Sequence, residues 1–113
     1  MAKHLALSFN KSLSQATNHF QLVHSDIWGP ALIPFRSGYL YYVSFVDDFT
    51  RFTWVYLMRQ RSKIPTIYQN FTAMIHTQFD AKIKTFRVDY TREYISTTMR
   101  FILQSHGTLF QQS

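Results

Sequence analysis

Two aspartates of this chain sit in strand-like, largely apolar surroundings, and a carboxylate in that setting needs a chemical reason. Asp26 follows the run Leu22-Val-His-Ser, and Asp89 follows Phe86-Arg-Val. A carboxylate among apolar neighbours must be hydrogen-bonded, protonated or bound to a cation. The sequence has only six acidic residues, so their use here indicates a site. The pair predicts a divalent-metal site suited to phosphodiester chemistry, because Mg²⁺ prefers oxygen ligands and two ions can stabilise both oxygens of a phosphoryl displacement.

Each aspartate also has an alternative interpretation. Asp26 stands close to Gly29, where it can be a partly exposed strand end. Asp89 precedes Tyr90 and can serve as a cap or turn acid. We favour the metal site for both residues.

The other candidate ligands are better explained by structure. Asp47 and Asp48 are adjacent, so in a strand they would point to opposite faces, and a role in a hairpin turn is favoured over a catalytic pair. His24 shares the face of Asp26 in an extended strand, but a packed or hydrogen-bonded histidine is favoured over a ligand. The chain has no cysteine, and its five histidines show no zinc-ligand spacing without a cysteine pair.

Basic and aromatic clusters leave two interpretations open. Three basic residues can contact phosphate or can form a solvated junction between a strand and a helix; they are Arg59, Arg61 and Lys63. Three tyrosines can stack on bases, but hairpin and core packing is favoured; they are Tyr39, Tyr41 and Tyr42. Trp28 and Trp54 are assigned to the core or its rim.

The elements that must position these residues form an α/β pattern. Strands are expected at 20–28, 39–47, 52–58, 83–89 and 108–112, with an antiparallel hairpin across 48–51. One helix is expected from a Ser62 cap to Phe79, and a second from a Ser96 cap to Gly107. The order β-β-β-α-β-α-β predicts a mixed sheet. If the fourth strand lies parallel beside the first, Asp26 and Asp89 occupy neighbouring strands.

Composition favours one small domain with an anionic partner. The 113 residues are 46% hydrophobic and carry twelve Lys and Arg against six Asp and Glu, a net charge of +6. This balance favours nucleic acid, with a merely basic surface as the alternative. No apolar leader and no membrane-length apolar run occurs. We therefore expect an intracellular protein, in the nucleus or cytoplasm and not secreted, without a membrane partner.

Four segments, in order, resemble the integrase catalytic core of copia-type retrotransposons; they are Leu22-Val-His-Ser-Asp-Ile-Trp-Gly-Pro30, Tyr42-Val-Ser-Phe-Val-Asp-Asp-Phe-Thr-Arg51, Thr53-Trp-Val-Tyr-Leu57 and Phe86-Arg-Val-Asp-Tyr-Thr-Arg-Glu-Tyr94. His106-Gly107 resembles the glycine that follows in the family. The resemblance implies a ribonuclease H-like fold and metal-dependent DNA 3′-end processing and strand transfer. It also implies DNA as a partner, and self-association into a homo-oligomer is a further expectation.

By the same resemblance, Asp26 and Asp89 match the first and second metal-binding carboxylates, which would bind Mg²⁺ or Mn²⁺ weakly. The family's third carboxylate has no counterpart in this sequence, and Glu93 matches a different glutamate. Tyr90 and Val88 depart from the family pattern and can affect metal binding. We therefore expect a polar arm at 1–19 and a partial core at 20–113, truncated at both ends and inactive alone. The alternatives are a non-catalytic nucleic-acid or protein interaction module, or a transposon remnant without selected function.

Overall fold

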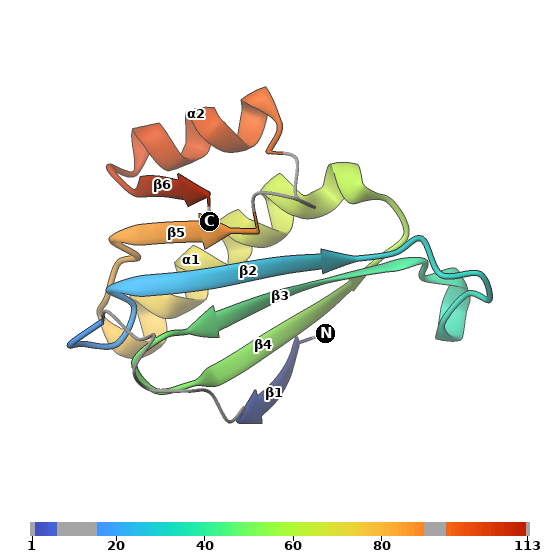
Figure 1. Cartoon of the computed structure of the whole chain (residues 1–113), viewed down its shortest axis with the longest axis horizontal. Helices are drawn as coiled ribbons and strands as arrows, with labels where there is room; N and C mark the ends of the chain where they lie inside the picture. Colours follow the sequence, from blue (N-terminus) through green and yellow to red (C-terminus); the bar gives the residue numbers. More distant parts are fainter. Residues whose placement is uncertain (1, 7–15, 90–94, 113) are drawn as a thin grey trace.

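The computed structural model describes residues 2–6, 16–89 and 95–112, and these form one six-stranded sheet with helices on one side (Figure 1). The strand order across the sheet is β1-β4-β3-β2-β5-β6. The strands are β1 (Ala2–Ala6), β2 (Leu22–Trp28), β3 (Tyr41–Asp47), β4 (Phe52–Met58), β5 (Thr85–Val88) and β6 (Leu109–Gln112). The helices are α1 (Ile64–Phe79) and α2 (Thr97–Ser105), with short 3-10 turns η2 (Arg36–Gly38) and η3 (Arg61–Lys63).

The predicted α/β order of five strands and two helices is confirmed, and a further strand precedes it. That strand, β1, lies within the segment expected to be a polar arm and pairs antiparallel with β4. The hairpin between β3 and β4 is confirmed, with the Arg51 amide donating to the Asp47 carbonyl at 2.8 Å. Strands β2 and β5 are parallel neighbours, as expected, because α1 carries the chain back across the sheet between β4 and β5.

The helix ends differ in how well the sequence predicted them. Ser62 does not cap α1: it lies inside η3, where its hydroxyl group donates to the Gln60 side chain at 3.3 Å. The chain enters α1 through this turn, so the capping position falls on Lys63, whose side chain makes no capping hydrogen bond. The predicted Ser96 cap of α2 is confirmed, since its hydroxyl accepts a hydrogen bond from the Met99 amide at 3.1 Å.

The core lies between α1 and one face of the sheet. The Phe71 ring of α1 stacks on Phe45 of β3 with centroids 4.4 Å apart, and Tyr68 meets Phe86 of β5 edge-on at 5.0 Å. Burial raises the pKa of Tyr68 to about 12. These aromatic contacts fix the parallel pair β2–β5 against α1, because β5 contributes Phe86 to the same cluster.

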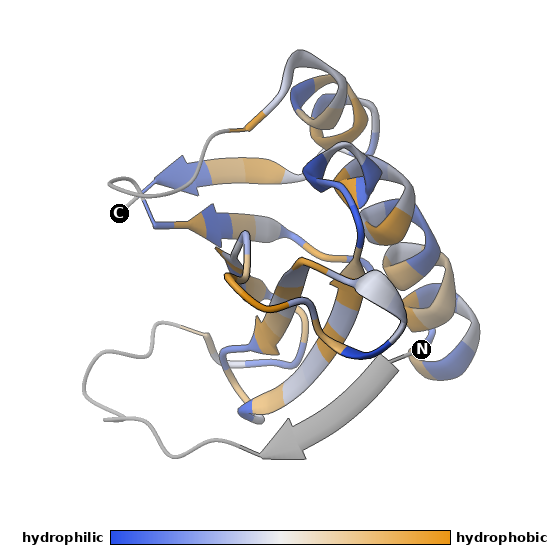
Figure 2. Cartoon of the chain, turned by 90° about the vertical axis from the view of Figure 1, so that its right-hand side faces the viewer, coloured by the Kyte–Doolittle hydropathy of each residue, from blue (hydrophilic) through white to orange (hydrophobic). Residues whose placement is uncertain are grey.

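The other face of the sheet carries no helix within the part of the chain that the structure describes, and we call it the open face (Figure 2). Strand alternation decides which residues reach it, because successive side chains point to opposite sides. In β2, Val23 and Ile27 are buried toward α1, so Asp26 and Trp28 belong to the open face. No helix in the described ranges has the length and apolar character needed to cross a membrane.

Candidate metal site

Asp26 and Asp89 come from neighbouring parallel strands and lie on the same face of the sheet. The pairing of β2 with β5 runs from Leu22 opposite Thr85 to Ser25 opposite Val88. If this register continued by one step, Asp26 would lie opposite Asp89, which directly follows β5. Ser25 and Val88 are both buried toward α1, so alternation turns the next residue of each strand to the open face. The β2–β5 register thus ends one residue before each of the two aspartates, and the metal site that the sequence predicts for them stays a prediction.

The surroundings of Asp26 correct one premise of the sequence analysis. The apolar neighbours of Asp26 predict a free-energy cost for burying its carboxylate, but the side chain is exposed. The alternation of β2 buries only the residues beside it, so no burial penalty falls on its carboxylate. Asp89 is half-buried. Asp26 lies opposite Ser44 of β3 and one residue beyond the end of the β2–β5 register. This position, and not a cost of burial, makes Asp26 a candidate ligand.

The donor set at this place fits a hard divalent cation. Two carboxylates reach a water-accessible face from adjacent strands, and Mg²⁺ binds through one or two carboxylates while keeping several waters. No group of three His, Cys, Asp or Glu residues gathers anywhere in 2–6, 16–89 or 95–112. Glu93, and with it Tyr90, lies outside the described residues. The described part of the site thus contains two carboxylates that could serve as ligands.

Asp47 has the structural role in the hairpin that the sequence predicted. Its side chain is 1% exposed, and one carboxylate oxygen accepts a hydrogen bond from the Phe20 amide at 2.7 Å. The other oxygen accepts from the Thr50 amide at 3.1 Å and from the Thr50 hydroxyl at 2.6 Å. Asp47 therefore joins the β3–β4 turn to the residues that lead into β2.

Asp48 holds His24, the histidine nearest the site in sequence. The Asp48 carboxylate lies 2.8 Å from His24 Nε2 and 3.0 Å from the Arg51 guanidinium. Its second oxygen accepts from the Ala16 amide at 3.2 Å. The prediction that His24 is hydrogen-bonded is confirmed, and the contacts of Asp48 with His24 and Arg51 brace β2 against the β3–β4 turn.

The basic cluster after β4 divides into two roles. The Arg59 guanidinium lies over the Tyr39 ring at 4.6 Å and donates to the Ser37 carbonyl at 2.8 Å, so it fixes the loop before β3. Arg61 and Lys63 are exposed in η3. For these two residues, both interpretations from the sequence stand: they can contact phosphate or lie in a solvated junction between a strand and a helix.

Sequence reasoning did not single out Arg87, which the structure places on the open face opposite His24. Its guanidinium donates to the Gln111 side chain of β6 through Nε at 3.0 Å and through a terminal nitrogen at 2.7 Å. The available signal was its position two residues before Asp89, which gives both side chains the same face. Arg87 adds a positive charge beside the carboxylate pair.

Trp28 lies at the rim of the open face, whereas Trp54 is in the core with 9% exposure. Trp28 is 40% exposed. Its ring runs nearly parallel to Tyr42 of β3, with centroids 5.9 Å apart and planes 15° apart, and it meets Phe35 at 5.8 Å. The favoured interpretation of Tyr42 as a packing residue is confirmed, since it pairs with Trp28 across the strands.

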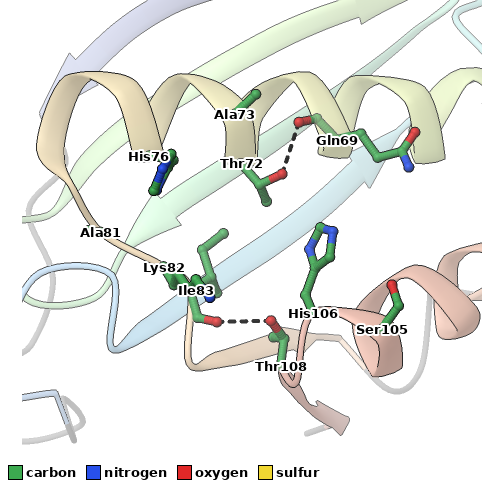
Figure 3. A pocket seen from close by; sticks show the side chains of 10 residues that line it. All are labelled: Gln69, Thr72, Ala73, His76, Ala81, Lys82, Ile83, Ser105, His106 and Thr108. Carbon is green, nitrogen blue, oxygen red and sulfur yellow. Dashed lines mark hydrogen bonds between the residues drawn. The ribbon is translucent and has the colours of Figure 1, made fainter.

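A cleft of about 480 Å³ opens on the helix side of the molecule, away from the aspartates (Figure 3). Its basic side chains come from α1, from the connection to β5 and from the end of α2; they are His76, Lys82 and His106. Two hydroxyl groups drawn there donate to backbone carbonyl groups, Thr72 to Gln69 at 2.8 Å and Thr108 to Ile83 at 2.9 Å. Lys82 thus gives the cleft one positive charge, and the cleft is a second surface with which the open face is compared as a place for DNA.

The sequence profile described as "Integrase core domain" matches residues 16–112. The retrovirus-related Pol polyprotein from transposon TNT 1-94 of Nicotiana tabacum is 34% identical over 101 residues, covering 89% of this chain and 8% of that protein. The corresponding polyprotein of transposon RE1 of Arabidopsis thaliana is 32% identical over 99 residues, covering 88% and 6%. This chain thus spans less than a tenth of these relatives' length.

Among solved structures, the HTLV-2 integrase catalytic core domain in complex with magnesium, in its dimeric form, aligns with a TM-score of 0.61 at 13% identity. The alignment covers 87% of this chain and 63% of that one. A simian T-cell lymphotropic virus intasome in complex with PP2A regulatory subunit B56 gamma aligns with a TM-score of 0.65 at 13% identity, covering 90% and 37%. At this identity the likeness shows the fold alone.

Proposed function

Because this chain belongs to the integrase core domain family, we propose that it forms the metal- and DNA-binding core of a copia-type retrotransposon integrase. Its relatives are retrotransposon Pol polyproteins, and its fold is the ribonuclease H-like α/β fold of integrase cores. The observation that supports the proposal is the parallel register of β2 and β5, which ends at Ser25 and Val88, one residue before Asp26 and Asp89. DNA integration is the activity to which this core would contribute.

In this proposal Asp26 and Asp89 hold Mg²⁺ or Mn²⁺ through their carboxylate oxygens. A bound ion would supply Lewis-acid stabilisation of charge on phosphate oxygens. The remaining residues keep the site in place. Asp48 contacts both His24 and Arg51, and these contacts hold β2 against the β3–β4 turn two residues before Asp26. Arg87, held by Gln111, contributes positive charge next to the carboxylates, where a DNA phosphate would lie.

We expect Mn²⁺, at millimolar concentration, to broaden the amide NMR signals of residues around Asp26 and Val88. A paramagnetic ion held by both carboxylates relaxes nearby nuclei even when it binds weakly. Asp26→Asn and Asp89→Asn should each abolish the selective broadening, because an amide replaces an anionic oxygen ligand. The measurement is a series of two-dimensional spectra recorded during titration with Mn²⁺.

Asp80→Asn is the matched control for this titration. Asp80 is exposed at the end of α1, with φ +52°, and asparagine tolerates this left-handed conformation. The same chemical change there should leave the Mn²⁺ effect at Asp26 intact. Broadening that is absent around Asp26, or that survives both site substitutions, would refute the metal site.

We expect weak, sequence-independent DNA binding that falls steeply with added salt. The net charge of +6 favours displacement of condensed counterions from the duplex, so log affinity should fall linearly with log salt concentration. Fluorescence anisotropy of a labelled duplex at several salt concentrations measures this slope. Binding that is absent at low salt, or indifferent to salt, would contradict a nucleic-acid role.

Two charge-removing variants test which surface the DNA uses. Arg87→Gln removes a charge from the open face, and Lys82→Gln removes one from the cleft on the helix side. If DNA lies across the carboxylates, Arg87→Gln should weaken binding more and should reduce the salt slope by about 1. A larger effect of Lys82→Gln would place the DNA on the helix side instead.

A non-catalytic nucleic-acid interaction module is the second candidate function. The observation that favours it is the absence of a third carboxylate beside Asp26 and Asp89 among the described residues. This candidate shares the DNA-binding expectation but not the metal expectation. DNA binding together with a negative Mn²⁺ titration would therefore select the module over the integrase core.

A further inference from the structure

The open face carries an aromatic surface immediately beside the carboxylates. Trp28, Tyr42 and Phe35, which we call the aromatic group, come from the end of β2, the start of β3 and the loop between them. The rings of Trp28 and Tyr42 are nearly parallel, with centroids 5.9 Å apart. Trp28 is thus held in a stacked pair with Tyr42, and 40% of it remains exposed.

Its distance from Asp26 suits contact with DNA held at the carboxylates. Trp28 follows Asp26 by two residues in the same strand, so alternation gives both side chains the open face. Two residues of a strand span about 6.6 Å. Successive phosphates of a DNA strand advance by about 3.4 Å along the helix axis. A phosphate at Asp26 therefore brings bases one or two nucleotides away within reach of Trp28.

Exposure and charge favour a nucleic-acid base as the occupant. Trp28 is 40% exposed although it belongs to the central strand β2. Leu57, which pairs with Tyr42 across β3 and β4, continues the apolar row and is 41% exposed. An exposed Arg36 follows Phe35 directly. An exposed tryptophan ring with a cationic neighbour matches a stacked base attached to an anionic backbone.

We propose that Trp28 stacks on a base of the DNA strand whose phosphate lies at Asp26 and Asp89, with Tyr42 and Phe35 holding its ring. Trp28 is thus a positioning residue for the DNA end rather than a metal ligand. The inference rests on the proposed function, since the carboxylates define where the phosphate lies. Because every base has an aromatic face, the contact tolerates any sequence and favours unpaired bases.

Tryptophan fluorescence reports this contact directly, because the chain has only two tryptophans and Trp54 is buried. A single-stranded oligonucleotide should quench the emission of the intact chain. An oligonucleotide of the same length with abasic sites has the same charge and should bind without equal quenching. In Trp28→Phe, Trp54 is the sole fluorophore, so the quenching should disappear while affinity is largely kept by the phenyl ring.

Trp28→Ala should weaken binding of the single strand about 5- to 150-fold, the range that corresponds to losing one base–aromatic stack. Its affinity for the abasic oligonucleotide should not change. Phe101→Ala is the matched control, because Phe101 is 68% exposed on α2. Circular dichroism of both variants checks that they fold.

The outcomes separate the stacking proposal from the proposed function. Unchanged affinity of Trp28→Ala, or equal quenching by the abasic strand, would overturn stacking while salt-dependent DNA binding persists. If neither the intact chain nor any variant binds DNA at low salt, the stacking proposal and the DNA-binding function both fail.

Discussion

The 113-residue chain, assayed alone with Mg²⁺ or Mn²⁺, is expected to join no DNA ends, even at high protein concentration. Two-metal phosphoryl transfer needs enough anionic oxygens to fix both ions around the reacting phosphate. Within the described residues, Asp26 and Asp89 have no third carboxylate or histidine grouped with them. Asp47 and Asp48 are buried and hydrogen-bonded in the β3–β4 turn, so they cannot complete the shell. Strand transfer on a labelled DNA end measures this.

Two further assays follow from this expectation, one for the case in which the chain joins DNA ends and one for the case in which it does not. If the chain alone performs strand transfer and Asp26→Asn abolishes it, the expectation is contradicted. Glu93 or a second subunit would then be the candidate source of the third carboxylate. Joining the chain to the following segment of a related integrase core should restore activity only if Tyr90 leaves the metal accessible. The extended chain should therefore be compared with its Tyr90→Asn variant.

Asp47→Ala is expected to lower the free energy of unfolding by about 3 kcal/mol, because a hydrogen bond to a charged group contributes about 1.5–3 kcal/mol and a buried donor left unsatisfied costs about 1–3 kcal/mol. The carboxylate is 1% exposed and accepts three hydrogen bonds, from the Phe20 amide and from the amide and hydroxyl of Thr50. Alanine would leave the Phe20 amide buried without this acceptor. Urea denaturation at neutral pH measures the change, with the slope of the transition checked for a two-state comparison.

Asp26→Ala provides the matched control for that measurement. It removes the same carboxylate from an exposed position in the neighbouring strand, so it should change stability little. If Asp47→Ala proved as mild as Asp26→Ala, the hydrogen bonds of Asp47 would not hold the entry to β2 in place. The pair of variants thus separates a structural aspartate from a candidate ligand by one thermodynamic measurement.

The sequence predicted most of the fold because its local signals are strong. Aromatic and β-branched runs placed β3 and β4, and the helical spacing from Ile64 to Phe79 placed α1. Ser96 capped α2 as expected, since its hydroxyl meets the Met99 amide. Ser62 had the same residue type but failed as a cap, because the 3-10 turn η3 shifted the start of α1. Strand β1 was missed, because it gains its hydrogen bonds from distant β4.

The sequence by itself determined which aspartates to pair, which histidine to set aside and which family the chain resembles, because these depend on residue type and local spacing. Only the tertiary structure decided that Asp26 is exposed, that Asp48 holds His24, and that Trp28 shares an open face with the carboxylates. The physical reason is the sheet. The register between β2 and β5, and the side that α1 covers, arise from contacts between residues far apart in the chain. Local pattern fixes the alternation of a strand, but packing chooses which alternate residues face solvent.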